Sequence, residues 1–448
     1  MTAPSDATPP DLAPPDAAPP DLAPRGAEPK GNGPQASRRG LLAAAGGLAA
    51  AIGSGFSAHA AVPEAAAQRQ KATEDFWGPH QAGIVTPAQE HTYFAAFDLT
   101  TDQRAEVVKL LQSWTAAAAR MAAGATAAPL ASELDAPGAD SVEAVGLAPS
   151  RLTVTFGFGA GLFEKDGKDR YGLASSRPVA LIDLPRFNGD QLVPARTGGD
   201  LSVQACADDP QVAFHAVRQL ARLAYDVAEI RWAQSGFLSR PAKPGETPRN
   251  LMGFKDGTQT PLRVEQVVWV NQDGPVWMRG GSYVVVRRIR MALEHWDRTN
   301  VGFQEQTIGR HKLSGAPLGL KGEFEPLGLD RTDKDENPII PENAHVRLAN
   351  AASNNGAELL RRGYSYNDGV NFTAERWPPW RQGMEYDAGL FFVGYQRDPR
   401  TGFVRIFENM AKFDMLNQFV THTGGGLFAC PGGTRDGEFI GQRLFDQA

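Results

Sequence analysis

Hydrophobic positions in the chain follow two spacings, and each spacing predicts one kind of element. Between residues 107 and 121, apolar side chains recur three or four positions apart, which is typical of a helix that packs one face against a core. The side chains of this face are Val107, Leu110, Leu111, Trp114, Ala118 and Met121. A second helix is predicted to begin at Asp209-Pro210, because proline fits the first turn of a helix.

Short apolar runs rich in β-branched and aromatic residues predict strands around these helices. Such runs occupy residues 92–97, 152–156, 266–270, 283–286 and 390–393. They do not alternate with helices in a strict strand–helix–strand order, and no internal repeat is visible. The pattern therefore favours an α+β fold with antiparallel sheets.

The first 60 residues differ in composition from the rest of the chain. Residues 1–37 are dominated by proline, alanine and aspartate, which predicts disorder. Paired arginines at 38–39 lead into an uncharged run rich in alanine and glycine, and small residues at 58–60 have the spacing of a cleavage site. We interpret residues 1–60 as a leader with a twin-arginine export signal. A buried helix or a membrane anchor is the alternative interpretation.

The rest of the chain is long enough for two domains. A polar stretch with proline and glycine at 243–248 predicts an N-terminal domain over 61–247 and a C-terminal domain over 248–448. The net charge of −6 argues against a nucleic-acid binder, which needs a basic face, and we predict no transmembrane span. Cys206 and Cys430 form no paired ligand set for zinc, and whether they pair with each other stays open.

Three local patterns carry candidate chemistry. The run Gly-Phe-Lys-Asp-Gly-Thr at 253–258 places an acid in a turn between two glycines. The run Ala-His-Val-Arg-Leu-Ala-Asn at 344–350 offers an imidazole, which can hold a haem iron. The run Leu-Leu-Arg-Arg-Gly-Tyr-Ser-Tyr at 359–366 places two arginines between aliphatic and aromatic residues. Taken singly, each has a plainer explanation: a surface turn, a structural histidine or a solvated arginine pair.

In this order, the three patterns resemble the dye-decolorising peroxidase family, most closely its twin-arginine-exported branch described as deferrochelatase/peroxidase. The likeness covers nearly the whole mature chain and includes Gly-Leu-Phe-Phe-Val-Gly-Tyr-Gln at 389–396. It implies a fold of two ferredoxin-like halves with antiparallel sheets. It also implies one non-covalent haem b in the C-terminal half, with His345 as the proximal ligand of the iron. His311 and His295 are the rival ligands.

The resemblance places Asp256 and Arg361 on the distal side of the haem. A positioned carboxylate can move a proton between the two oxygens of peroxide. A fixed guanidinium can stabilise negative charge as it develops on the leaving oxygen. A buried aspartate–arginine ion pair is the alternative role, and the neighbouring Arg362 is the substitute for Arg361.

Two further segments are implied to line the haem. Their residues are Gly257, Thr258, Gln259, Asn350, Ala351 and Ala352. The second segment departs from the Asn-Pro-Arg that is usual in the family, so the contacts to the haem propionates are in doubt and Arg347 is a candidate replacement. Apolar residues at 390–392 are implied to form the distal wall.

The resulting hypothesis is a haem b peroxidase that reduces hydrogen peroxide while it oxidises a bulky organic reductant such as a dye or phenol. The alternative from a different class is a haem-binding iron-uptake protein that releases iron from haem, as a deferrochelatase does. An electron-transfer haem protein would prefer two axial ligands. We expect export to the periplasm or beyond, self-association into a homo-oligomer and, under the alternative, iron-uptake components as partners. The natural reductant cannot be read from the residues.

Overall fold

The structure is a computed structural model that describes residues 73–130, 135, 138–241, 243, 245–258, 263–374 and 382–447. The leader and export signal predicted at 1–60 therefore lie outside the described residues. Within the described part of the chain, no helix combines the length and the hydropathy needed to cross a bilayer.

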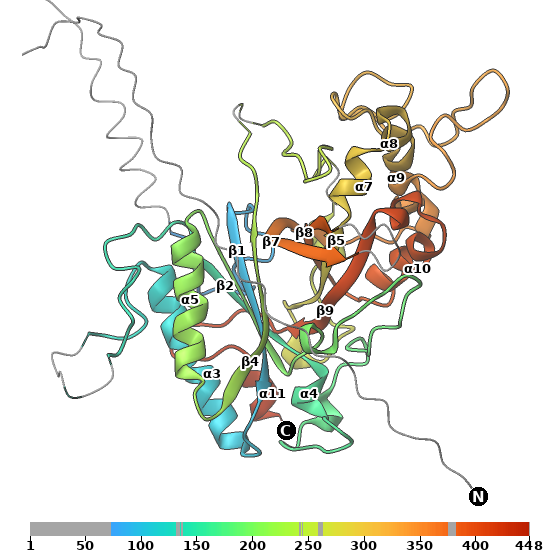
Figure 1. The fold of residues 1–448 in the computed structure, drawn as a ribbon. Coiled ribbons are helices and arrows are strands. Elements are labelled where there is room, and N and C mark those ends of the chain that lie inside the picture. The colour runs from blue at the N-terminus through green and yellow to red at the C-terminus, as the bar shows by residue number, and fades with distance from the viewer. Residues whose placement is uncertain are drawn as a thin grey trace, which may run out of the picture. The chain divides into compact units, whose positions relative to one another are not determined.

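The described strands form one antiparallel sheet that closes on itself (Figure 1). The strands are β1 (His91–Leu99), β2 (Thr153–Phe158), β3 (Leu201–Ala207), β4 (Ala228–Phe237), β5 (Ser282–Met291), β6 (Leu360–Arg361), β7 (Tyr364–Ala374), β8 (Gln382–Gln396) and β9 (Val420–Cys430). Their order is β5-β9-β2-β3-β1-β4-β7-β8, and β8 pairs again with β5. The short β6 adds to β8 beside β7.

This closed sheet overturns the expectation of two separate ferredoxin-like halves. Strands from the two parts of the chain pair with each other at both seams: β2 meets β9 through Phe158 and Ala429, and β4 meets β7 through Phe237 and Ser365. Neither part of the chain therefore keeps a sheet of its own. The hydrophobic pattern indicated β1, β2, β5 and β8 but not the other strands. The partner of a strand depends on contacts between distant segments that local spacing does not encode.

Helices cover the outside of the closed sheet. The α-helices are α3 (Arg104–Ala122), α4 (Ala160–Phe163), α5 (Pro210–Leu223), α6 (Val264–Val267), α7 (Leu293–Asp297), α8 (Val301–Ile308), α9 (His345–Leu348), α10 (Phe403–Phe413) and α11 (Gln442–Asp446). Short 3-10 helices are η1 (Ala174–Ser176), η2 (Pro194–Arg196), η3 (Val276–Met278), η4 (Ala351–Asn354) and η5 (Met415–Gln418). Both long helices predicted from the sequence are present, and Asp209 caps α5 by accepting from the backbone of Gln211 and Val212.

One predicted strand is wrong. Residues 266–270 overlap the end of α6 and then continue in irregular chain. Val268 and Trp269 are nevertheless fully buried in the cluster that fills the closed sheet. An apolar run of this length predicts that the segment is buried. It does not predict whether the segment is a strand, a helix or a loop.

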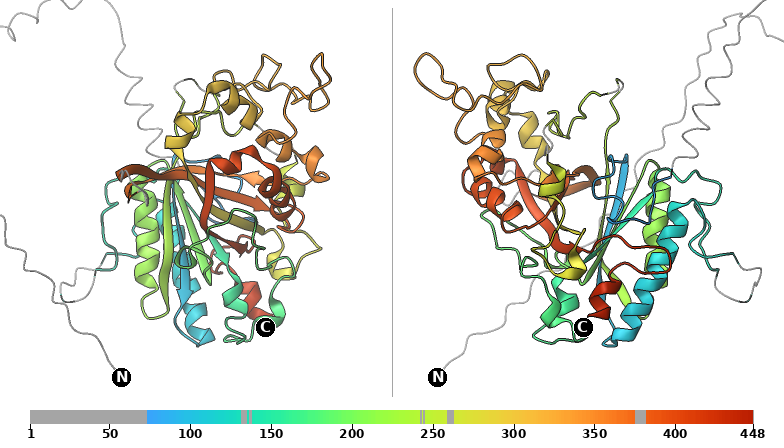
Figure 2. Two further views of the ribbon diagram at one scale, coloured as in Figure 1. Left: turned by 45° about the vertical axis from the view of Figure 1, so that its right-hand side comes forward. Right: turned by 180° about the vertical axis from the view of Figure 1, so that it is seen from behind.

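The closed sheet has a packed interior and two differently covered outer faces. The interior side is identified by contacts between strands that are not neighbours, such as the hydrogen bond of 2.6 Å from Tyr395 on β8 to Gln204 on β3. On the outside, α3 and α5 pack over β1 and β3 (Figure 1). Short helices and loops cover the outer face of β5, β8 and β9 (Figure 2). The candidate site lies on this second outer face.

Candidate active site

His345 is the first residue of α9, and its ring is held by a carboxylate. Its Nδ1 lies 2.7 Å from Oδ2 of Asp414, which follows α10 and is buried. The backbone amide of Leu416 donates to the other oxygen of Asp414 at 2.8 Å and fixes the carboxylate. Because Nδ1 is engaged, Nε2 is the nitrogen that remains to bind a metal, in the arrangement common to metal-ligating histidines.

The electrostatics of His345 combine opposing effects. Burial lowers the pKa of the imidazole, but the charge and the hydrogen bond of Asp414 outweigh burial and leave the pKa raised. Arg361 lowers this pKa and Asp256 raises it, so the charges of both groups reach the ring. The three residues therefore belong to one site although they lie far apart in the sequence.

Asp256 and Arg361 form an ion pair in this site. Nη1 of Arg361 lies 3.3 Å from Oδ1 of Asp256, and the two side chains are 40% and 29% exposed respectively. Asp256 is positioned by its turn: its amide donates to Pro248 at 2.8 Å, and Gly257 takes φ +110°, which favours glycine. A pair this exposed adds little to stability, so its position is better explained by a function than by folding.

The sheet register decides between the two neighbouring arginines. Arg361 pairs with Gly394 of β8 and meets Asp256 on the outer face. Arg362 is buried, and its guanidinium donates to the carbonyl of Thr86 and, at 2.9 Å, to Gln89. Successive residues of a strand point to opposite faces, so only Arg361 can contribute to this site.

The same register divides the expected apolar wall. Leu390 and Phe392 pair with Ile289 and Arg287 of β5 respectively and share the outer face with them. Leu390 packs against the cluster beside α7 and α8. Phe391 points the other way and is fully buried inside the closed sheet. Two of the three residues expected to form the wall therefore lie on the outer face, and the third belongs to the hydrophobic core.

Arg287 is a candidate site residue that sequence reasoning did not name. Its side chain is only 2% exposed, yet Nε and Nη2 have no hydrogen-bond partner among the described residues, and the nearest carboxylate oxygen, of Asp190, is 3.5 Å from Nη1. Burial lowers the pKa of Arg287 and Asp190 raises it, with a net lowering. His422 lies close enough for Arg287 to lower its pKa too. The available signal was the pair of arginines inside an apolar strand.

The first segment implied to line the haem is only partly placed. The hydroxyl of Thr258 donates to Glu323 at 3.2 Å, and Glu323 also pairs with Lys255. This contact ties the turn of Asp256 to the loop that precedes α9. Gln259 lies outside the described residues.

The second implied segment forms η4 and its cap. Asn350 accepts from the amide of Ala352 at 2.9 Å, and Ala351 begins the 3-10 helix. Arg347 is not free to replace the missing arginine, because its guanidinium donates to the carbonyls of Leu329 and Ile340. Arg347 therefore does not replace the arginine that the family usually has at the position of Ala352.

The rival histidines are engaged elsewhere. Nδ1 of His311 lies 2.8 Å from Glu305, and the ring of His295 packs 4.8 Å from that of Phe419. Neither has a buried carboxylate partner comparable to Asp414. Cys206 and Cys430 are both buried free thiols, so they do not pair.

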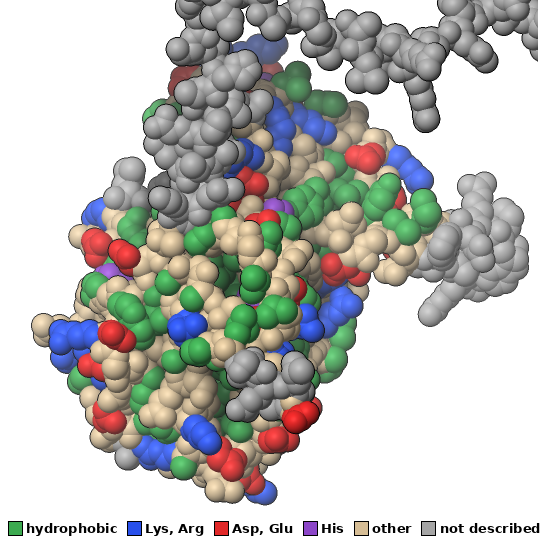
Figure 3. All heavy atoms as spheres, turned by 90° about the vertical axis from the view of Figure 1, so that its left-hand side faces the viewer, with side chains coloured by type: hydrophobic (Ala, Val, Ile, Leu, Met, Phe, Trp, Pro, Cys, Tyr) green, Lys and Arg blue, Asp and Glu red, His purple; other side chains and the backbone are tan. Residues whose placement is uncertain are grey.

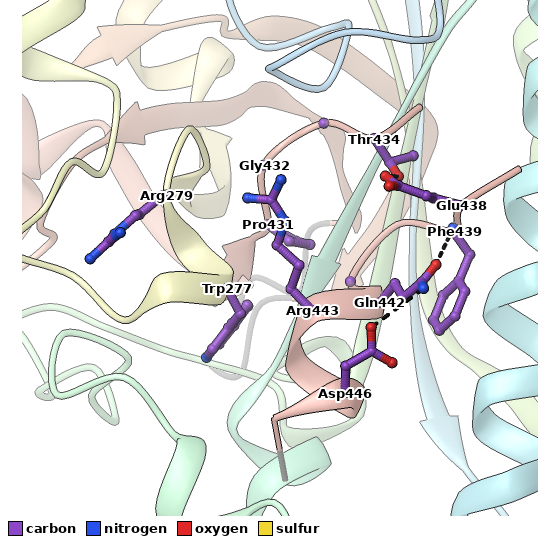
Figure 4. Close-up of a pocket in the computed structure, with 12 residues that line it drawn as sticks. Trp277, Arg279, Pro431, Gly432, Thr434, Glu438, Phe439, Gln442, Arg443 and Asp446 are labelled. Carbon is purple, nitrogen blue, oxygen red and sulfur yellow. Dashed lines mark hydrogen bonds between the residues drawn. The ribbon is translucent and has the colours of Figure 1, made fainter. Parts of the chain in front are cut away.

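A cavity of about 80 Å³ lies apart from these residues (Figure 4). It is lined by Trp277, Arg279, Pro431, Gly432, Gly433, Thr434, Glu438, Phe439, Gly441, Gln442, Arg443 and Asp446. None of the residues expected to form the site lines it, and Figure 4 shows it where α11 packs near Trp277. The cavity therefore lies where the C-terminal residues pack against the segment around Trp277.

Comparison with known proteins identifies the family. The model of the Dyp-type peroxidase N-terminal region matches residues 81–238, and that of the C-terminal region matches residues 247–435. The chain belongs to the Dyp-type peroxidase family. It is therefore a haem peroxidase, and the function expected from the three sequence patterns is confirmed.

Relatives of this Dyp-type peroxidase agree with that identification. The chain is 39% identical to a dye-decolorizing peroxidase of Thermobifida fusca, over 92% of this chain and 97% of the relative. It is 36% identical to a deferrochelatase of Escherichia coli K12, with the same coverage. The structure of ferric DtpA from Streptomyces lividans aligns with a TM-score of 0.76 and 41% identity, over 85% of this chain and 98% of DtpA.

Proposed function

We propose that this peroxidase reduces hydrogen peroxide at one non-covalent haem b bound on the outer face of β5 and β8, with His345 as the iron ligand. When bound, the haem supplies the iron that binds peroxide and accepts its oxidising equivalents. Support comes from Nε2 of His345, which the contact of Nδ1 with Asp414 leaves available, and from the Asp414 carboxylate that orients the ring.

The observation that carries the proposal is the ion pair of Asp256 and Arg361 within electrostatic reach of His345. In this function Asp256 accepts the proton of one peroxide oxygen and returns it to the other. Arg361 keeps its positive charge throughout and stabilises the negative charge of the leaving oxygen. Leu390 and Phe392 limit water on this face. Simple haem carriage would need neither charged group.

Arg287 is the candidate partner for a haem propionate. A buried guanidinium with two unpartnered nitrogens fits an anionic group, because each unsatisfied buried donor costs about 1–3 kcal/mol. Arg287 lies on the same outer face as Phe392 and Leu390. This role would compensate for the absence of arginine after Asn350. By resemblance, the two segments stay proposed haem neighbours, with Gly257, Thr258, Gln259, Asn350, Ala351 and Ala352.

The test is a spectroscopic comparison of haem-loaded variants. Wild-type protein should show a Soret band that changes rapidly on mixing with hydrogen peroxide. Asp256→Asn should keep the band and slow the change by about 10²–10⁴-fold, the usual contribution of a general acid–base group. His345→Ala should lose haem affinity by more than about 100-fold, since even outer partners of a metal ligand contribute 10–100-fold.

His311→Ala is the matched control for His345→Ala, because it removes another histidine that contacts a carboxylate. It should bind haem as the wild type does. Equal haem retention in His345→Ala and His311→Ala would overturn the ligand assignment. An unchanged peroxide rate in Asp256→Asn would overturn the role of the carboxylate.

A second function is supported by the names of several relatives. The Escherichia coli protein that is 36% identical bears the name deferrochelatase, so release of iron from haem is the alternative activity. Incubation of the haem-loaded protein with a ferrous chelator distinguishes the two. Free iron together with an intact iron-free porphyrin would support the alternative, and unchanged haem alongside peroxide turnover would support the peroxidase alone.

We propose export by the twin-arginine route, a mature chain with domains over 61–247 and 248–448, and self-association. The paired arginines at 38–39 and the small residues at 58–60 support export. Replacement of both arginines by lysine should leave the protein in the cytoplasmic fraction. The reductant is proposed to be a bulky dye or phenol. Iron-uptake components are partners only under the alternative.

A further inference from the structure

A second cluster of chemically competent side chains lies in the N-terminal part of the chain, where the haem proposal gives it no role. It is formed by Asp140 and Glu143, in the loop before β2, and by His215 on α5. Figure 1 shows this loop in teal beside α5. On this side of the molecule, acidic and basic side chains are interspersed over the surface (Figure 3), but Asp140 and His215 lie beneath it.

The three side chains converge on His215. Its Nε2 lies 3.4 Å from Oδ2 of Asp140, and its Nδ1 lies 3.1 Å from Oε1 of Glu143. One ligand atom from each residue lies within 4.8 Å of the other two. Asp140 and His215 are buried and Glu143 is mostly buried. Two carboxylates this close are costly in a dry environment unless a cation accompanies them.

The loop holds the two carboxylates in place from outside the cluster. Backbone amides of Ala127 and Val142 each donate to Asp140 at 2.7 Å, one to each oxygen. The hydroxyl of Ser141 donates to the carboxylate of Glu143 and holds it in the loop. Oε1 of this carboxylate is buried and has no well-aligned hydrogen-bond donor among the described residues.

We propose that Asp140, Glu143 and His215 bind a divalent transition-metal ion, for which Zn²⁺ is the probe. Zinc takes nitrogen and oxygen ligands at about 2.0–2.2 Å in a tetrahedron, which places neighbouring ligand atoms roughly 3.3–3.6 Å apart. The separation of 3.4 Å between His215 and Asp140 already fits this value. Glu143 contacts the other ring nitrogen, Nδ1, so its side chain must move toward the Nε2 side to join the same ion. Water would complete the fourth position.

The ligand set also indicates which cations fit. An imidazole favours zinc and other first-row transition metals over Mg²⁺ and Ca²⁺, which prefer oxygen alone. Arg218, whose Nη1 lies 3.2 Å from Glu143, is half exposed and can turn into solvent when a divalent ion takes its place. The competing explanation is a protonated His215 that clamps the loop to α5 without any metal.

The test is calorimetric titration of Zn²⁺ into the purified haem-loaded protein at pH 7.5. We expect binding of one ion per chain. Glu143→Gln and His215→Ala should each weaken binding at least tenfold, while the Soret band and the peroxide rate stay unchanged. Glu143→Gln nearly preserves shape, so it remains informative if His215→Ala folds poorly.

His311→Ala is the matched control, because His311 has a single carboxylate partner among the described residues, Glu305 at 2.8 Å. It should bind Zn²⁺ as the wild type does. Absence of Zn²⁺ binding to the wild type would overturn the proposal in favour of the histidine clamp. Equal affinity in the wild type and Glu143→Gln would also overturn it.

Discussion

Arg287 and Arg288 are neighbours on β5, yet one faces the outside of the closed sheet and the other its interior. Arg288 has a partner for every guanidinium nitrogen: Nε donates to Gln234, Nη1 to Thr423, and Nη2 to both Asp368 and Asp387. On Arg287, Nε and Nη2 have none among the described residues. Both side chains are buried, so exposure does not explain the difference.

The difference distinguishes an arginine that stabilises the fold from an arginine whose donors are available to a ligand. A buried donor without a partner costs about 1–3 kcal/mol, so a fold retains one only where a ligand or water satisfies it. Arg361 and Arg362 show part of the same contrast: the inner Arg362 donates to Thr86 and Gln89, although its Nε has no partner among the described residues, and the outer Arg361 pairs with the partly exposed Asp256. We therefore expect outer-face arginines to govern haem chemistry and inner arginines to govern stability.

The largest expected contrast is between Arg361→Leu and Arg362→Leu. Arg361→Leu should slow the reaction with hydrogen peroxide by about 10²–10³-fold, the usual cost of removing a group that stabilises developing negative charge. Its unfolding free energy should hardly change, because the pair with Asp256 is partly exposed to solvent. Stopped-flow absorbance at the Soret band and thermal unfolding measure the two effects.

Arg362→Leu should behave in the opposite way. Loss of its donors leaves the buried acceptors on Thr86 and Gln89 unsatisfied, which should lower the unfolding free energy by about 2 kcal/mol or more. The folded fraction should react with peroxide at the wild-type rate. A slow, fully stable Arg362→Leu protein would show that the two faces have been assigned the wrong way round.

A smaller contrast is expected between Arg287→Leu and Arg288→Leu. Arg287→Leu should weaken haem binding about tenfold, because a charged hydrogen bond contributes about 1.5–3 kcal/mol. Arg288→Leu removes one partner of a buried ion pair and should destabilise the fold by about 3 kcal/mol. Haem titration of the apoprotein and chemical unfolding measure the two effects.

Asp190→Asn is the control for Arg287→Leu, since it removes the nearest carboxylate and leaves the guanidinium in place. It should bind haem at least as tightly as the wild type. If Asp190→Asn and Arg287→Leu lose haem equally, the contact between Asp190 and Arg287 has a structural role, and the propionate role of Arg287 is wrong.

The sequence predicted those parts of the site that sit inside short motifs. Asp256 and His345 each lie in a run whose residue order resembles the family, so both could be named before the fold was known. Asp414 could not, because it lies 69 residues after His345 and no spacing links them. Only the packing of α9 beside α10 brings that carboxylate to the imidazole.

The choice between Arg361 and Arg362 shows a second limit. A shift of one residue in strand pairing exchanges the faces of every side chain, so the sequence could only offer both arginines. The pairing of Arg361 with Gly394 resolves the choice. The closed sheet was missed for a related reason, because β2–β9 and β4–β7 join distant parts of the chain through single residue pairs.

The last prediction concerns pH and the histidine beside Arg287. His422 is buried, and burial together with the charge of Arg287 lowers its pKa to about 3. In the unfolded chain its pKa is near 6.5, so below that pH the unfolded state binds more protons than the folded state. His422 should therefore destabilise the apoprotein progressively as the pH falls from about 6.5 toward 3, by up to about 1.4 kcal/mol per pH unit.

His422→Leu should remove that part of the acid dependence, measured as unfolding free energy from pH 7 to pH 4. Arg287→Leu should reduce it partly, because the remaining burial still disfavours the charged ring. Identical pH slopes in the wild type and His422→Leu would mean that His422 is not held neutral. Equal slopes in the wild type and Arg287→Leu would mean that the charge of Arg287 does not influence the protonation of His422.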